Sequence, residues 1–183
     1  MSAAGKSAAA MSRALPLALA ASAMAICSVA LSADFNIEAL AGVYKKTFRN
    51  GNIDGGKYKS EDILEIVKVS PTTAYIRTHL EFFNGHICDI WGVAAVEGDA
   101  LVYRGKNNIE GNACILSIRI AGGKVTLADE HDACTVGTCG NRGMYTGEKF
   151  DLTARRVIRY LNALTRSDQY TGAIQEYEAK GRR

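Results

Sequence analysis

The overall charge of this chain is close to neutral and points to no strongly charged partner. The sequence has 183 residues, with 22 Lys and Arg against 19 Asp and Glu, and its net charge is +3. A balance so close to neutral implies neither a nucleic acid nor an anionic membrane as partner. We therefore predict no nucleic-acid function, and the length corresponds to a single domain once the N-terminal segment is set aside.

Residues 1–33 have the pattern of a secretory signal peptide. Two basic residues are followed by an apolar run over residues 14–31 and then by small residues. This order is typical of a cleaved leader. The run is also long enough to anchor the chain in a bilayer, but small residues interrupt it and no basic cluster follows. We expect cleavage near residues 30–34, no stable membrane insertion afterwards, and a periplasmic or secreted domain.

Short segments with a two-residue period follow the leader. This period is typical of strands that bury one face, and Asn84-Gly85 favours a tight two-residue hairpin turn. The expected strands cover residues 42–48, 62–69, 74–83, 86–96, 100–104, 114–120, 124–128 and 144–150. We predict a mainly β domain over residues 34–150, an eight-stranded antiparallel meander that closes into a barrel.

The turn at Asn84-Gly85 also predicts which side chains of its hairpin share a face. It pairs Leu80 with Asp89 and places both Asp89 and Trp91 on the apolar face that points into the barrel. Burying an unpaired carboxylate is energetically costly, so such a residue is expected to have a bonding partner or a functional role. Asp89 and Trp91 are therefore candidate binding residues, and the alternative is a structural Asp89 that binds a backbone N–H or Arg104.

The polar face of the same hairpin carries His79, Glu81 and His86. Histidines beside a carboxylate can hold a metal or act as an acid–base pair. A solvated outer face predicts the same mixture, and the two histidines lie far apart along the hairpin. We therefore predict no catalytic site there.

Four cysteines lie in the β region: Cys88, Cys114, Cys134 and Cys139. An exported domain with four cysteines is expected to form two disulfides, and three pairings are possible. Positions near strand ends favour Cys88–Cys114 together with Cys134–Cys139. Cys88 and Cys114 fall on conflicting faces, however, so the pairings of either residue with Cys134 or Cys139 stay open.

The segment from Asp129 to Asp132 is the densest group of metal-ligand residue types. It includes His131 and precedes Cys134 and Cys139. Disulfides would consume the thiols, and the spacing matches neither paired zinc-binding cysteines nor the calcium-binding EF-hand loop. We predict no metal and no other cofactor, and retain Asp129 and His131 as candidate binding residues.

The loop from Cys134 to Arg142 is predicted to be a recognition surface. It has little apolar surface to bury, and a cysteine restrains it within a glycine-rich stretch. The planar guanidinium of Arg142 suits bidentate contact with an anionic or carboxylate group of a partner. Two structural alternatives are an ion pair of Arg142 with Asp129 or Asp132, and a loop that plugs one mouth of the barrel.

The period changes in residues 151–183. Apolar residues recur at helical spacing from Thr153, and a second helix can begin at Ser167 or Asp168. We predict two amphipathic helices that pack on the barrel as a helical hairpin. A helix that binds a membrane surface or a partner is the alternative.

A short helical turn followed by Gly42-Val43-Tyr44 resembles the calycins, the lipocalin-like barrels, in which a Gly-x-Trp motif opens the first strand. The resemblance implies a closed barrel with an outer helix, and an arginine near the last strand that partners the motif, for which Arg142 is a candidate. It further implies a binding protein with a cup or an outer loop surface, and the small exported barrels that inhibit lysozymes are among its possibilities.

The sequence has no Gly-x-Ser-x-Gly elbow, phosphate-binding glycine-rich loop or His-Glu-x-x-His motif. We therefore expect an exported, non-enzymatic binding module for a small apolar ligand or for a protein partner such as a cell-wall hydrolase. The alternatives are an envelope enzyme using Asp89 or the Asp129–Asp132 acids with a histidine, and a structural envelope protein. A lumen filled by aromatic side chains would favour recognition from outside the barrel.

Overall fold

The structure is a computed structural model that describes residues 35–109 and 112–181, and it describes only the backbone of residues 106–109, 112 and 141. The predicted leader lies outside the described residues. Residues Ser32–Arg183 belong to one compact unit, which contains the complete sheet and both disulfides.

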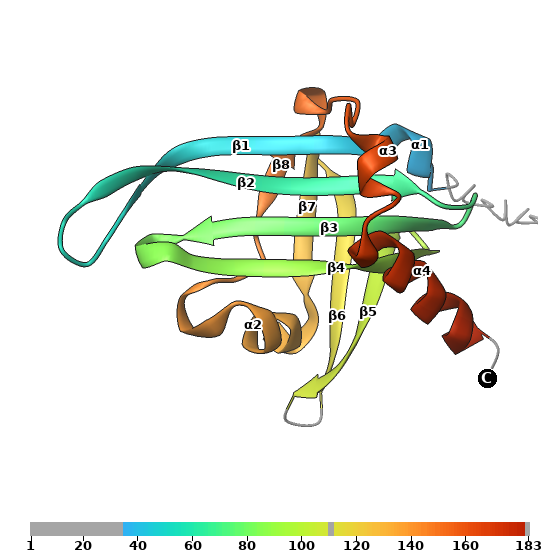
Figure 1. The fold of residues 1–183 in the computed structure, drawn as a ribbon. Coiled ribbons are helices and arrows are strands. Elements are labelled where there is room, and N and C mark those ends of the chain that lie inside the picture. Colours follow the sequence, from blue (N-terminus) through green and yellow to red (C-terminus); the bar gives the residue numbers. More distant parts are fainter. Residues whose placement is uncertain (1–34, 110–111, 182–183) are drawn as a thin grey trace, which may run out of the picture. The chain divides into compact units, whose positions relative to one another are not determined.

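The fold is mainly β, as predicted. Eight strands follow one another in sequence order, and every neighbouring pair is antiparallel. Together they form a nearly closed barrel (Figure 1). The strands are β1 (Gly42–Gly51), β2 (Lys57–Lys68), β3 (Thr73–Phe82), β4 (His86–Glu97), β5 (Ala100–Ile109), β6 (Asn112–Ala121), β7 (Lys124–Asp129) and β8 (Lys149–Asp151).

Four α-helices accompany the strands in the described part of the chain: α1 (Ile37–Leu40), α2 (Ala133–Thr138), α3 (Leu161–Leu164) and α4 (Asp168–Gly181). Single 3₁₀ turns lie at Phe83–Gly85, Glu130–Asp132, Gly140–Arg142 and Leu152–Ala154. Figure 1 shows α2 beside β4, β5 and β6, and α4 crossing the outer side of β4.

The interior of the barrel is filled by side chains. Alternate residues of every strand point inward, because successive side chains of a strand lie on opposite faces. The fully buried set is led by tyrosines and branched aliphatic residues: Tyr44, Leu64, Ile66, Ile76, Leu80, Leu101, Leu116, Ile118 and Tyr145. The Tyr44 ring also lies 6.4 Å from the ring of Phe150. The lumen is therefore a packed core.

The predicted faces of β4 are wrong by one residue. The turn spans three residues, Phe83–Gly85, and pairs Phe82 with His86. Asn84 (φ 61°) and Gly85 (φ 72°) both take left-handed conformations there, and the ring of Phe83 packs against Gly51 of the neighbouring hairpin. A shift of one residue moves every following side chain to the other face. Consequently Cys88 and Ile90 point into the barrel, whereas Asp89 and Trp91 lie outside.

The tail departs from the predicted helical hairpin in its first half. The helix expected from Thr153 is replaced by a 3₁₀ turn and an extended segment, and α3 is a single turn. Arg156 exchanges two backbone hydrogen bonds with Val43 of β1, at 2.8 and 3.0 Å. These bonds compete with a helix for the same N–H and C=O groups. The second expected helix is present as α4.

Arg155 connects the tail to the start of the barrel. Its Nη1 donates to the backbone oxygens of Glu38 and Ala39 at 2.7 and 3.2 Å, next to the end of α1. Gly42 lies beneath it with φ 151°, and a Cβ on Gly42 would come within 2.7 Å of the Arg156 oxygen. Arg155, rather than Arg142, is thus the arginine that packs against the Gly42-Val43-Tyr44 segment.

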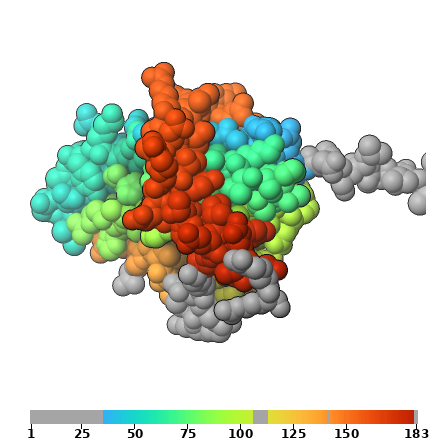
Figure 2. Space-filling model, turned by 45° about the vertical axis from the view of Figure 1, so that its right-hand side comes forward, coloured from blue at the N-terminus to red at the C-terminus, as the bar shows by residue number. Residues whose placement is uncertain are grey.

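The C-terminal tail lies across the outer face of the barrel (Figure 2). A second apolar layer lies between the tail and β1 to β3. The layer contains Val43, Val67, Tyr75, Ile158 and Leu164, with Tyr170 and Ala173 packed against it. The rings of Tyr75 and Tyr170 lie 4.9 Å apart. The amphipathic pattern of the tail therefore serves packing on the barrel.

Candidate functional site

The sheet opens between β4 and β5. These strands pair over four residues only, from Ala94–Tyr103 to Glu97–Ala100. Residues 86–93 of β4 pair with β3 alone among the described strands. The opening leaves a length of strand edge that other elements must cover, and α2 and α4 contact β4 there.

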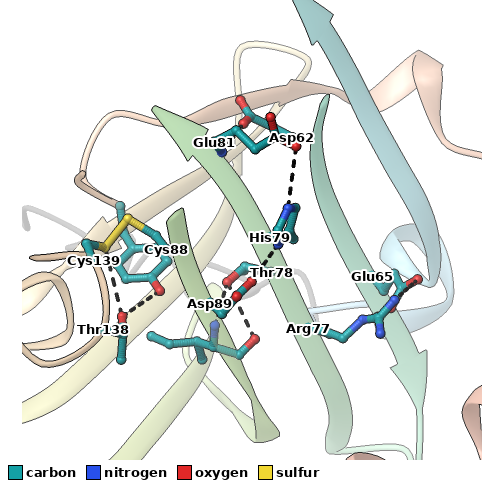
Figure 3. Close-up of polar contacts among 12 residues, drawn as sticks. Asp62, Glu65, Arg77, Thr78, His79, Glu81, Cys88, Asp89, Thr138 and Cys139 are labelled. Carbon is teal, nitrogen blue, oxygen red and sulfur yellow. Dashed lines mark hydrogen bonds and ion pairs between the residues drawn. A yellow bond between two sulfur atoms is a disulfide. The ribbon is translucent and has the colours of Figure 1, made fainter. Parts of the chain in front are cut away.

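Two disulfides hold α2 in this opening, and they correct the favoured pairing. The bonds are Cys88–Cys139, which joins β4 to the segment after α2, and Cys114–Cys134, which joins β6 to the start of α2. Cys88 and Cys114 both face inward because of the register of their strands, so each meets a cysteine of the segment beneath the opening. The helix is further tied to the core by a hydrogen bond of 2.8 Å between the hydroxyls of Thr138 and Tyr145 (Figure 3).

Asp129 is placed as a structural residue. It is buried, and its two carboxylate oxygens accept the backbone N–H groups of Cys134 and Thr135 at 3.0 and 2.7 Å. These are unpaired donors in the first turn of α2, which a carboxylate is well suited to satisfy. His131 is exposed, with φ 56°, and its Nε2 lies 3.7 Å from the Glu130 carboxylate. Asp129 is therefore held at the start of α2, whereas His131 faces solvent.

Arg142 forms no ion pair with Asp129 or Asp132, the two acids that a structural role would require as its partners. It is exposed, and its guanidinium lies 5.8 Å from the centre of the Phe83 ring at the β3–β4 turn. Neighbouring Gly143 is close-packed, since a Cβ there would lie 2.3 Å from the Cys88 sulfur. The predicted recognition loop is thus part helix and part stapled turn. Its buried side closes the opening and its other side, with Arg142, faces solvent.

A groove runs along the β4–β5 opening. It consists of two adjoining hollows, of about 330 and about 280 Å³, that share Trp91, Tyr103 and Glu176. The first hollow continues along α4 past Tyr177, and the second continues over α2 past Asp89. Trp91 is the only tryptophan of the chain and is 44% exposed. The groove therefore brings together residues from β4, β5, α2 and α4.

The floor of the groove depends on a glycine. A Cβ on Gly92 would lie 2.3 Å from the ring of Tyr103, so only glycine lets this ring cross from β5 to β4. Burial, followed by the charge of Glu176, raises the pKa of Tyr103. A tyrosine hydroxyl at the floor can act as a hydrogen-bond donor.

Charged pairs border the aromatic floor. Arg104 binds the Glu97 carboxylate through two nitrogens at 2.7 and 3.2 Å, and these hydrogen bonds hold the pKa of Glu97 below its usual range. On α4, Nζ of Lys180 lies 3.0 Å from Oε1 of Glu176, which is one helical turn earlier. Both signs of charge occur along the rim, so the groove suits a partner with apolar and charged groups rather than a purely apolar one.

Asp89 forms a polar cluster with two β3 residues beside the groove. Its Oδ1 lies 2.8 Å from Nδ1 of His79, and Nε2 of His79 lies 3.5 Å from the Glu81 carboxylate (Figure 3). Asp89 is 47% exposed, so the expected buried acid is absent from this position. His86 is not part of the cluster.

The residues that sequence analysis missed come from elements that only the fold brings together. Tyr103, Glu176 and Tyr177 appear as ordinary strand and helix residues in the sequence. The one signal for the groove was Gly92, a glycine in the interior of a strand, which often marks close approach of another group.

The chain was compared with protein-family models, curated proteins and solved structures, and none of them matches it. Within the described residues, no three His, Cys, Asp or Glu side chains are grouped to hold a metal ion. None of the helices in that part of the chain combines the length and the apolar character needed to cross a bilayer.

Proposed function

We propose that this chain is an exported, non-enzymatic binding module that recognises a protein partner, such as a cell-wall hydrolase, through the groove along the β4–β5 opening. The observation that carries the proposal is the combination of a filled barrel with an aromatic groove on its outside. A small apolar ligand inside the barrel is disfavoured, because large side chains already occupy the lumen.

The composition of the groove supports recognition of a protein segment. Trp91, Tyr103 and Tyr177 line it, and tryptophan and tyrosine are enriched among the residues that contribute most to protein interfaces. Trp91 and Tyr177 are each about two-fifths exposed. An exposed aromatic pair beside paired charges is the arrangement expected of a binding surface with an apolar centre and a polar rim.

The rigidity of the groove supports the same function. Both disulfides anchor α2 beneath the opening, and Lys180 of α4 donates to the backbone oxygen of Arg104 at 3.4 Å. Binding to a surface that is already ordered costs little conformational entropy. Such a scaffold favours tight recognition.

Two further features support an exported calycin-like protein. Two disulfides are compatible with an extracytoplasmic location. The resemblance to calycins also gains a second element, because Arg155 follows the last strand and binds the segment that precedes Gly42-Val43-Tyr44. Arg155 is therefore our candidate, in place of Arg142, for the arginine that the resemblance implies.

The test is capture from an envelope extract with three immobilised forms of residues 32–183. These are the wild type, Trp91→Ala in the groove, and Ile120→Ala, which removes a comparably exposed apolar residue from β6. We expect a protein that binds the wild type and Ile120→Ala but not Trp91→Ala. The purified partner should then change the fluorescence of Trp91, the only tryptophan. Equal capture by all three forms would contradict recognition through the groove.

One observation favours an enzyme as the second candidate, namely the contact of 2.8 Å between His79 and Asp89. An imidazole held by a carboxylate can act as a general base. The captured partner or cell-wall fragments should be incubated with the wild type and with His79→Gln, and any covalent change followed by mass spectrometry. A change that requires His79 would establish the enzyme, whereas binding that survives His79→Gln without such a change supports the binding module.

A further inference from the structure

The β1–β2 hairpin carries a basic surface away from the groove. In Figure 1 it extends past the ends of β3 and β4. Lys45 and Arg49 of β1 and Lys57 and Lys59 of β2 are exposed on its outward face, and Arg49 lies directly across from Lys59. Like charges at opposed positions of a sheet destabilise it. The net charge of the chain conceals this local excess.

Most of this positive charge is not neutralised within the protein. Lys45 binds Glu61 at 2.5 Å, but Arg49, Lys57 and Lys59 form no ion pair with any residue that the structure describes. These three residues line a hollow of about 480 Å³ together with Thr47, Phe48 and Tyr58. No acid lines the hollow, so its chemistry suits an anionic group.

Apolar side chains lie at the same end of the hairpin. Ile53 at the tip is 76% exposed, and Phe83 of the adjacent β3–β4 turn is 46% exposed. The two turns are joined, because the Ile53 N–H donates to Oδ1 of Asn84 at 3.2 Å. The only acid of the tip, Asp54, accepts the N–H of Gly56. Cations and exposed apolar groups therefore lie next to each other.

The hairpin is held in position by contacts with the end of β3 and the β3–β4 turn. The hydroxyl of Tyr58 donates to the Phe82 oxygen at 3.3 Å and accepts the N–H of Gly85 at 2.8 Å. Phe83 also packs against Gly51. These contacts fix the basic surface relative to Ile53 and Phe83 before any ligand arrives.

We propose that the β1–β2 hairpin docks the protein on an anionic phospholipid surface. Arg49, Lys57 and Lys59 would bind lipid phosphates while Ile53 and Phe83 enter the boundary between headgroups and acyl chains, the combination that favours reversible attachment to a membrane surface. A nucleic acid offers phosphates but gives the exposed Ile53 nothing to bury against. An exported chain, moreover, meets lipid headgroups. This proposal is independent of the groove.

The test uses residues 32–183, the unit that holds the whole sheet and both disulfides. Its co-sedimentation with vesicles of phosphatidylcholine alone is compared with that of vesicles containing phosphatidylglycerol. The test variant combines Arg49→Gln, Lys57→Gln and Lys59→Gln. The control removes the same charge elsewhere by combining Lys149→Gln, Arg156→Gln and Arg159→Gln, all exposed positions. Melting temperatures are measured for all forms.

We expect binding only to the anionic vesicles, weakened by added salt and reduced roughly a hundredfold in the test variant, since each basic residue near the surface contributes a factor of about five. The control variant should bind nearly as the wild type does, and Ile53→Ser should weaken binding. Equal losses in both triple variants, or no preference for anionic vesicles, would overturn the proposal. So would tighter binding to a DNA oligonucleotide than to vesicles with no effect of Ile53→Ser.

Discussion

Arg77 on β3 binds both carboxylate oxygens of Glu65 on β2, at 2.6 and 3.0 Å, where Glu65 is 0% exposed. The two residues are directly paired in the sheet register, and the hydroxyl of Tyr160 reaches the same carboxylate from the tail. Figure 3 shows the Arg77–Glu65 pair. With the Tyr160 contact, this buried carboxylate is satisfied from the barrel and from the tail together.

Replacing Arg77 with methionine should lower the free energy of unfolding by about 3 kcal/mol, because it leaves the Glu65 charge buried and uncompensated. Denaturant unfolding measures this loss. The double variant Glu65→Leu with Arg77→Met should recover most of it. As a control, Arg104→Met breaks an exposed pair and should change stability little. Equal effects of Arg77→Met and Arg104→Met would show that burial of Glu65 is not decisive.

Five of the eight tyrosines should titrate late in alkali. Burial raises the pKa of Tyr44, Tyr75 and Tyr160 to about 12, and it also raises the pKa of Tyr103 and Tyr145. The stability that these groups contribute is complete below pH 10, where unfolded tyrosines are neutral, and is lost as the pH rises toward 12. Ultraviolet titration should show this late ionisation coinciding with unfolding. Ionisation of all eight tyrosines near pH 10 in a folded protein would contradict it.

The two disulfides should contribute unequally to stability. Loop-closure entropy predicts a loss of about 4 kcal/mol for Cys88→Ala with Cys139→Ala and about 3 kcal/mol for Cys114→Ala with Cys134→Ala, since the bonds close 51 and 20 residues. Thermal unfolding of the two double variants measures the difference. Peptide mapping without reduction should find these two pairs and no free thiol in residues 34–183. Recovery of a Cys88–Cys114 peptide would refute the connectivity.

Arg142→Ala separates recognition by the stapled turn from recognition by the groove. The guanidinium contacts an exposed ring, an interaction of about 0.5–1 kcal/mol, so the melting temperature should change by no more than a few degrees. If the turn contributes an anchor, partner binding weakens by about 1–3 kcal/mol. Unchanged binding by Arg142→Ala together with lost binding by Trp91→Ala would confine recognition to the groove.

The sequence predicted seven of the strands because their two-residue period is a local property, whereas the eighth, expected over residues 144–150, is limited to Lys149–Asp151. The meander, the strand order and the second tail helix follow from that pattern. The register of β4 did not follow, because Asn84-Gly85 is compatible with loops of two and three residues. Packing of Phe83 against Gly51, a contact between residues 32 positions apart, accompanies the longer one. One residue of error was enough to place Asp89 and Trp91 on the wrong face.

The candidate site was predictable only in part for the same reason. Trp91 and Asp89 were selected, yet for burial in a lumen that other side chains fill. Tyr103, Glu176 and Tyr177 became site residues because β4 and β5 separate and α4 crosses the opening. Nothing local distinguishes them, so the groove is a property of the tertiary structure. The cysteine pairing was not predictable for the same reason. Which cysteines of β4 and β6 face inward depends on the register of each strand, and the sequence alone does not determine the register of β4.

The opening between β4 and β5 gives the disulfides a second consequence. Residues 86–93 of β4 have no strand partner on the β5 side among the described residues, and an uncovered strand edge is a template for pairing with another chain. If reduction releases α2, the same edge that forms the groove becomes available for intermolecular β-sheet formation. Loss of oxidation should therefore appear first as concentration-dependent self-association, before the barrel itself unfolds.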